Sequence, residues 1–120
     1  MRTFSRAERV GGQVRRLLSE ILQRRTKDPR LKAATISGVT MSRDLRTARI
    51  YFTTSGGEKN REAVLEGFQS ARGHLKRTLA AELGLRYMPD LSFHYDGSLD
   101  YGENIDRLLK SIQAENGPDH

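Results

Sequence analysis

The sequence predicts an α+β domain in which helices pack on one face of a three-stranded sheet. Three observations support this class: an amphipathic helical pattern near the N-terminus, three short strand-like segments, and a long helical pattern between the second and third of these segments. At 120 residues the chain has the length of one domain. We expect this domain to span residues 1–115 and residues 116–120 to form a disordered tail.

The first helix is predicted from its cap and its apolar stripe. Ser5 precedes Glu8 by three residues, which is the spacing of a capping box. Gly11 and Gly12 cost about 1 kcal/mol each relative to alanine, which is tolerable if the stripe packs on a sheet. The helix should end before Asp28-Pro29, because proline disfavours helical geometry in the preceding residue. The stripe consists of Val10, Val14, Leu17, Leu18, Ile21 and Leu22.

Two strands joined by a hairpin are predicted next, over Ala34–Met41 and Thr47–Thr54. The polar segment Ser42–Arg46 supplies the turn between them. Gly38 interrupts the first strand and is typical of a β-bulge. A third strand is predicted over Leu91–Asp96, where apolar and polar residues alternate.

The segment between the second and third strands has a helical pattern that runs from a second capping box, Ser55 to Glu58, to about Leu83. Gly84 is a typical C-terminal stop. Ser70–Gly73 lies in the middle, and its glycine is a poor helix former, so we expect a break there and two helices, at about 58–70 and 73–83.

A last amphipathic helix is predicted from the spacing of Ile105, Leu108, Leu109 and Ile112. The complete order is then α-β-β-α-kink-α-β plus a C-terminal helix. A hairpin followed by a helical crossover into a third strand gives one sheet with helices on one face. This is the element order of a type II KH-like domain.

The charge distribution predicts a polyanionic partner. The net charge is +6, from 21 Lys and Arg against 15 Asp and Glu, and ten of the basic residues lie within residues 1–32. An anionic membrane is the alternative to nucleic acid, but the stripe of the first helix lacks the aromatic residues of interfacial helices. With no cysteine and no apolar segment of membrane-spanning length, we expect a cytoplasmic protein that does not bind membranes.

Catalysis has little support in the sequence. His74, His94 and His120 are isolated and form no metal-binding pattern, so we expect no enzyme activity, no metal and no cofactor. Gly56-Gly57 precedes a helix and resembles a phosphate cradle, but no P-loop lysine accompanies it. A tight turn is the preferred interpretation.

The break at residues 70–73 is the best candidate for a binding element, because the turn between paired helices clamps the nucleic-acid backbone in KH folds. A plain kink with solvated cations is the alternative, and the residues alone leave both open. Few aromatic residues are expected to stack on bases, only Tyr51 and Tyr87, so phosphate contacts and RNA shape should dominate recognition. The candidate RNA-binding residues are Arg9, Arg15, Arg43, Arg46, Ser70, Ala71, Arg72, Gly73, His74, Lys76, Arg77 and Arg86.

Four motifs in order resemble the ribosome-binding factor A family. They are Lys27–Leu31, Ser42–Leu45 with Ala48, Ile50 and Tyr51 after it, Ala71-Arg72-Gly73, and Arg86–Ser98 leading into Ile105. The resemblance covers roughly residues 3–112. It implies that Ala71-Arg72-Gly73 replaces the GXXG loop of other KH domains as the RNA-binding kink.

The resemblance also implies a function in ribosome biogenesis. A member of this family binds the free small (30S) ribosomal subunit and its 16S rRNA near the 5′-terminal helix, supports late maturation and 5′-end rRNA processing, and aids growth in the cold. The resemblance further implies that the protein is a monomer with a functional link to a ribosome-dependent GTPase. A generic KH-type module in another RNA pathway, and a protein adaptor that uses the acidic C-terminal helix, are the alternatives.

Overall fold

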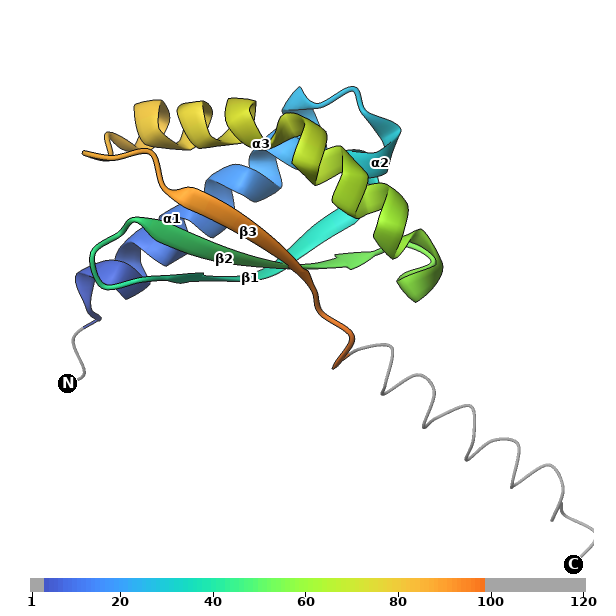
Figure 1. Cartoon of the computed structure of the whole chain (residues 1–120), viewed down its shortest axis with the longest axis horizontal. Coiled ribbons are helices and arrows are strands. Elements are labelled where there is room, and N and C mark those ends of the chain that lie inside the picture. The colour runs from blue at the N-terminus through green and yellow to red at the C-terminus, as the bar shows by residue number, and fades with distance from the viewer. Residues whose placement is uncertain (1–3, 99–120) are drawn as a thin grey trace, which may run out of the picture.

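A computed structural model of the chain describes residues 4–98, which form one three-stranded sheet with helices on one side (Figure 1). Strand β1 (Ala34–Met41) pairs antiparallel with β2 (Thr47–Thr54), and β2 pairs in parallel with β3 (Asp90–Tyr95). The strand order is β1-β2-β3. The predicted α+β class, the three strands and the hairpin are confirmed.

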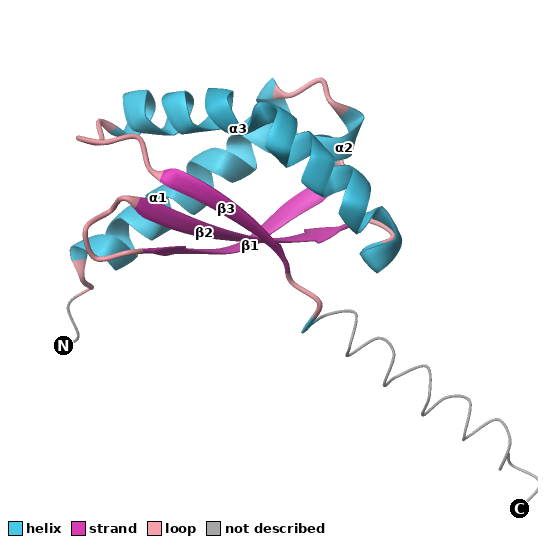
Figure 2. Cartoon of the chain, in the orientation of Figure 1, coloured by secondary structure: helices cyan, strands magenta, loops and turns pink. Residues whose placement is uncertain are grey.

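Two helices cover one face of this sheet. Helix α1 (Arg6–Glu20) packs on β1, and α3 (Arg61–Leu83) packs on β3 and against α1 (Figure 2). Within residues 4–98, no helix covers the opposite face, where Thr35, Arg49 and His94 are exposed.

Helix α1 begins as predicted, because the Ser5 hydroxyl accepts a hydrogen bond from the Glu8 backbone N–H at 3.1 Å. Gly11 is buried at the contact with β1, and a Cβ there would lie 3.3 Å from the carbonyl oxygen of Val39. This close packing of helix and strand explains why a glycine occupies the position. The helix continues as a π-helical turn, Ile21–Arg25, and ends before Asp28 as expected.

A short helix, α2 (Pro29–Lys32), follows this end and was not predicted. The Asp28 carboxylate accepts from the backbone N–H of Arg30 at 2.9 Å, which caps the helix. Proline at the first helical position is compatible with such a start, because its missing N–H would be unpaired there in any case.

The start of α3 differs from the prediction. The Ser55 capping box does not form; instead, Gly56 and Gly57 have φ angles of 87° and 66° and lead into a 3₁₀ turn, Gly57–Asn60. Such angles favour glycine, so the interpretation of these two glycines as a tight turn fits the structure. The predicted end at Gly84 is confirmed by its φ of 63°.

The expected separation into two helices at residues 70–73 is wrong. Helix α3 is continuous over its 23 residues, although Figure 1 shows it changing direction near its middle. Gly73 is exposed and has no positive φ. Phe68 and Leu75 are buried on either side of this segment, and this tertiary packing outweighs the low helix propensity of one glycine.

The bulge predicted at Gly38 is confirmed. Ile36 pairs with Phe52 and Gly38 with Tyr51, so Ser37 is the extra residue in β1. Because of this extra residue, Gly38 and Thr40 share a sheet face with Thr35, although they lie three and five positions further along the strand, where strict alternation would place them on the opposite face.

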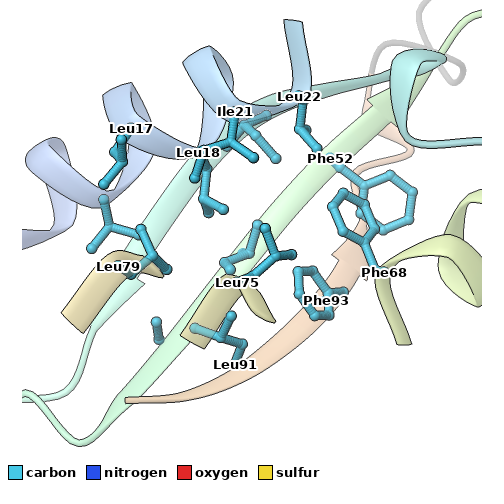
Figure 3. Close-up of a cluster of buried hydrophobic side chains, with 14 of the residues drawn as sticks. Leu17, Leu18, Ile21, Leu22, Phe52, Phe68, Leu75, Leu79, Leu91 and Phe93 are labelled. Carbon is cyan, nitrogen blue, oxygen red and sulfur yellow. The ribbon is translucent and has the colours of Figure 1, made fainter. Parts of the chain in front are cut away.

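The core lies between the sheet and the two long helices (Figure 3). Phe68 of α3 stacks on Phe93 of β3 with 4.3 Å between ring centroids, and its ring also lies 5.1 Å from that of Phe52. The residues of the predicted α1 stripe are all buried in this core. The predicted C-terminal helix at Ile105–Ile112 and the tail at 116–120 lie outside the described residues.

Candidate nucleic-acid interface

One end of the sheet brings together four arginines from three separate segments. Arg6 begins α1, Arg43 and Arg46 belong to the β1–β2 turn, and Arg86 belongs to the loop between α3 and β3. All four are exposed. We call this set the arginine end. Arg6, Arg43 and Arg86 line a cavity of about 220 Å³, together with Asp44, Leu45, Leu85 and Tyr87.

The β1–β2 turn is held by hydrogen bonds to one carboxylate oxygen. Asp44 Oδ1 accepts from the Ser42 hydroxyl at 2.7 Å and from the Arg46 backbone N–H at 3.1 Å. These bonds stabilise the charged carboxylate and hold the pKa of Asp44 below its usual range. The backbone N–H of Asp90 donates to the Arg46 carbonyl at 2.8 Å, so the turn is also tied to β3.

Tyr87 gathers two of the arginines around its ring. The guanidinium carbon of Arg46 lies 4.6 Å from the ring centroid, and that of Arg86 lies 5.4 Å from it. Cation–π contacts at exposed sites contribute about 0.5–1 kcal/mol each. The tyrosine therefore holds two positive charges close together without neutralising either.

Some basic side chains form ion pairs with carboxylates of the fold, whereas others are free to bind a ligand. Arg25 pairs with Glu82, Arg30 with Asp28, Arg61 with Glu58, and Lys76 with Asp90. Within residues 4–98, no carboxylate lies within ion-pair distance of any member of the arginine end. Asp44 interacts electrostatically with Arg46 beyond ion-pair distance and offsets part of this charge, and the remaining positive field is directed at solvent and at an approaching polyanion.

The predicted binding residues of α3 lie on a helix rather than in a loop. Ser70, Gly73, His74 and Arg77 are exposed, whereas Ala71 and Arg72 are partly buried. Residues 70–73 lie inside α3, so this segment lacks the free backbone N–H groups that the start of a separate helix would present.

The two basic residues of α3 that interact with Asp90 of β3, Lys76 and Arg72, have different surroundings. Lys76 Nζ lies 3.0 Å from Asp90 Oδ1, which makes it part of the contact between helix and strand. Arg72 Nε is buried and has no hydrogen-bond partner among the described residues. Side chains, and not the backbone, are therefore what this segment offers to RNA.

Arg9 and Arg15 are exposed on α1, as a binding role requires. Arg15 borders a surface groove on the outer side of the helix with Arg16 and Arg24, which were not predicted to bind RNA. Arg6, which adds to the arginine end, was not predicted either. The sequence indicates these three arginines only through the high density of arginines in the first 32 residues. That density does not show which arginines come together in the fold.

The uncovered sheet face carries a smaller polar cluster. Tyr51 and His94 are paired across β2 and β3, and their ring centroids lie 5.5 Å apart at 34°. Exposed Arg49 lies on the same face. Tyr51, one of the two predicted stacking residues, thus contacts another ring, while Tyr87 belongs to the arginine end.

Residues 4–98 contain no group of three or more acidic or histidine side chains arranged to hold a metal ion. No helix in this part of the chain combines the length and the apolar character that crossing a membrane requires.

Comparison with known proteins identifies relatives over almost the whole chain. The family model of ribosome-binding factor A matches residues 6–109. The ribosome-binding factor A of Desulfatibacillum aliphaticivorans is 45% identical over 119 residues, which cover 99% of this chain and 97% of that protein. That of Geobacter sulfurreducens is 40% identical over 116 residues, covering 97% and 98%.

Solved structures agree with this match. A crystal structure of ribosome-binding factor A from Thermus thermophilus gives a TM-score of 0.63 at 29% identity, covering 72% of this chain and 92% of that one. A homology model of the factor from the same organism, fitted into a cryo-EM map of its 30S complex, gives 0.64 at 29% identity, covering 78% and 98%. A solution structure from Thermotoga maritima gives 0.66 at 27%, covering 78% and 90%. The KH-like fold of these neighbours is that of the present chain.

Proposed function

Because the chain belongs to the ribosome-binding factor A family, we propose that it binds the free small ribosomal subunit and acts there as an assembly factor. The observation that carries this proposal is the arginine end, where Arg6, Arg43, Arg46 and Arg86 converge without ion-pair partners among the described residues. Neutralising phosphates releases condensed counterions and supplies most of the affinity of such a surface for RNA.

The proposed mode of binding uses phosphates for attachment and RNA shape for selection. Phosphate contacts fix the position of a protein on RNA but carry no sequence information. The arginine end would make the first contacts with 16S rRNA. Arg9 and Arg15 on α1, and His74 and Arg77 on α3, would extend the contact surface on the helical side.

The proposed role is to favour one rRNA conformation, without catalysis. A ligand shifts an equilibrium only by its difference in affinity for the two states. By binding the matured arrangement near the 5′-terminal helix more tightly, the protein would support late subunit maturation and processing of the 16S 5′ end. We further propose that it works in the cytoplasm as a monomer, with release linked to a ribosome-dependent GTPase, and that the need is greatest in the cold.

Sedimentation through a sucrose gradient tests this proposal. The tagged protein should travel with free small subunits and be absent from translating ribosomes. The double variant Arg43→Glu/Arg86→Glu should leave that fraction. Lys59→Glu is the matched control, because Lys59 is an exposed cation beyond the opposite end of β2, without an ion-pair partner among residues 4–98.

Two outcomes would contradict the proposal. Capture of other RNA without any subunit association would favour a KH-type module in another RNA pathway. Partners that resist ribonuclease would favour a protein adaptor.

A further inference from the structure

We propose that the cavity at the arginine end binds one guanine nucleotide extruded from single-stranded RNA. This inference rests on the proposed RNA-binding function and assigns it a base-specific site. The cavity lies between the β1–β2 turn and the loop after α3, and its walls include apolar, cationic and acidic side chains.

The dimensions and walls of the cavity suit a single base. Its volume is about 220 Å³, below the range of roughly 300–1,000 Å³ found for drug-sized ligands. Leu45, Leu85 and Tyr87 provide the apolar surface. Splayed bases of single-stranded RNA stack on such aromatic and apolar groups.

The cationic side chains fit the phosphates on either side of such a base. Arg6, Arg43 and Arg86 line the cavity and have no ion-pair partner in the described part of the chain. A base that enters between them brings its own phosphates to the rim. The cavity is therefore suited to a nucleotide within a strand, with phosphates on both sides.

Asp44 supplies the base selectivity. Its Oδ1 atom is occupied by Ser42 and Arg46, whereas Oδ2 has no hydrogen-bond partner among residues 4–98. The hydrogen bonds to Oδ1 also keep the carboxyl group charged, because they hold its pKa low. An ionised carboxylate only accepts hydrogen bonds.

Guanine is the base that matches such an acceptor. Its Watson–Crick edge presents two adjacent donors, N1–H and the N2 amino group. Adenine and cytosine each place an acceptor beside their amino group, and uracil places its one donor between two acceptors. Single-stranded RNA is read on these edges. An acceptor-only oxygen should therefore bind guanine in preference to the other three bases.

Fluorescence anisotropy with short RNAs tests the inference on the full chain. The probes are uridine nonamers that carry guanosine, adenosine, cytidine or uridine at the centre. The guanosine probe should bind on the order of tenfold more tightly, as expected for one well-made pair of hydrogen bonds. Equal affinity for all four probes would overturn the proposal.

Two variants locate the site. Asp44→Asn keeps one oxygen for Ser42 and Arg46 but replaces the other by an amino donor, so the preference for guanosine should disappear while binding to the uridine probe persists. Asp96→Asn is the control at the opposite end of β3, where Asp96 Oδ1 likewise accepts from a hydroxyl and a backbone N–H, both of Ser98, and Oδ2 accepts from the Ser37 hydroxyl at 3.0 Å. A preference for guanosine that survives Asp44→Asn would overturn the proposal.

A second test does not depend on the folding of the Asp44 variant. Tyr87→Leu should weaken binding of every nonamer, whereas Tyr87→Phe, which keeps the aromatic ring, should not. Equal effects of the two changes would place the base elsewhere and overturn the site.

A competition experiment separates the two sources of a guanine nucleotide. Free 5′-GMP should displace the guanosine nonamer only at much higher concentration, because it lacks the phosphate on the other side. Competition at equal concentration would overturn the assignment to RNA. If the nonamers show no preference but the protein still travels with small subunits, the pocket assignment fails and the proposed function stands.

Discussion

Lys76 on α3 donates a hydrogen bond to Asp90 at the start of β3, with 3.0 Å between Nζ and Oδ1. The backbone N–H of the same aspartate donates to the Arg46 carbonyl of the β1–β2 turn. One residue thus connects the long helix, the parallel strand and the turn that carries two arginines. Lys76 thus holds α3 to β3 next to this turn, whereas no member of the arginine end has an ion-pair partner among residues 4–98.

The first prediction compares Lys76 with Arg43. Lys76→Ala should lower the melting temperature only slightly, because Asp90 is largely exposed and solvent screens the pair. Its effect on subunit binding should be smaller than that of Arg43→Ala. Thermal unfolding and co-sedimentation of both variants measure this. A larger binding loss for Lys76→Ala would assign that lysine a direct contact with RNA.

The second prediction concerns salt. If phosphate contacts dominate, the logarithm of the affinity for rRNA should fall by about 0.7–0.9 per neutralised phosphate for each tenfold rise in salt. Arg86→Ala should reduce that slope by about one contact. Lys59→Ala should leave it unchanged. Titrations of subunits at several salt concentrations give the slopes, and a wild-type slope near zero would rule out a phosphate-dominated interface.

The third prediction compares two glycines of α3. Gly73→Ala should stabilise the protein by about 0.4–1 kcal/mol, because the position is helical and alanine restricts the unfolded chain. A Cβ there would meet only the movable end of Arg77, at 3.3 Å from Nη1. Loss of stability in thermal unfolding would instead indicate strain at the bend.

Gly67→Ala is the matched contrast for this change. A Cβ at Gly67 would lie 3.1 Å from Arg30 Cβ and 3.2 Å from Leu31 Cδ2, where α3 crosses α2. Overpacking of this kind costs about 1–3 kcal/mol. The two substitutions should therefore shift the unfolding temperature in opposite directions.

The fourth prediction concerns pH. Arg25 donates to both carboxylate oxygens of Glu82, joining the π-helical turn after α1 to the last turn of α3, and this contact holds the pKa of Glu82 below its usual range. Since the folded-state pKa is lowered, the stabilisation is complete above the unfolded pKa and is lost as the pH falls through the folded one.

Wild type and Glu82→Gln should therefore differ in melting temperature at neutral pH. The difference should shrink below about pH 4, where the unfolded carboxyl group takes up its proton. Melting curves over this range measure it. A difference that is independent of pH would mean that the glutamate stabilises the fold through packing instead of charge.

The parts of the fold that follow from local signals could be predicted. Ser5 and the apolar stripe define α1, and alternation defines the strands. Helix α2 was missed because Asp28-Pro29 was interpreted only as a stop, although a capping aspartate followed by proline also begins helices. The break in α3 was overpredicted because Gly73 is locally unfavourable, whereas the burial of Phe68 and Leu75 depends on the tertiary structure.

Most residues of the site could be predicted from the sequence, but the way in which they come together could not. Arg43, Arg46 and Arg86 were selected from the sequence, but their convergence with Arg6 depends on the parallel register that places Thr47 beside Asp90. Because a 23-residue helix separates these two strands in the sequence, their register is set by tertiary packing. No pattern within either segment encodes it.

The parallel pairing of β2 with β3 also sets when, during synthesis, the arginine end comes into existence. The β1–β2 hairpin closes over a short turn, whereas β3 pairs only after the whole of α3 has crossed over, and such long-range pairing is slow. A nascent chain that stops before Arg86 carries the hairpin arginines but neither Tyr87 nor the complete cavity. Because a ligand that recognises only the native state stabilises only that state, RNA should select the completed chains from the unfinished ones.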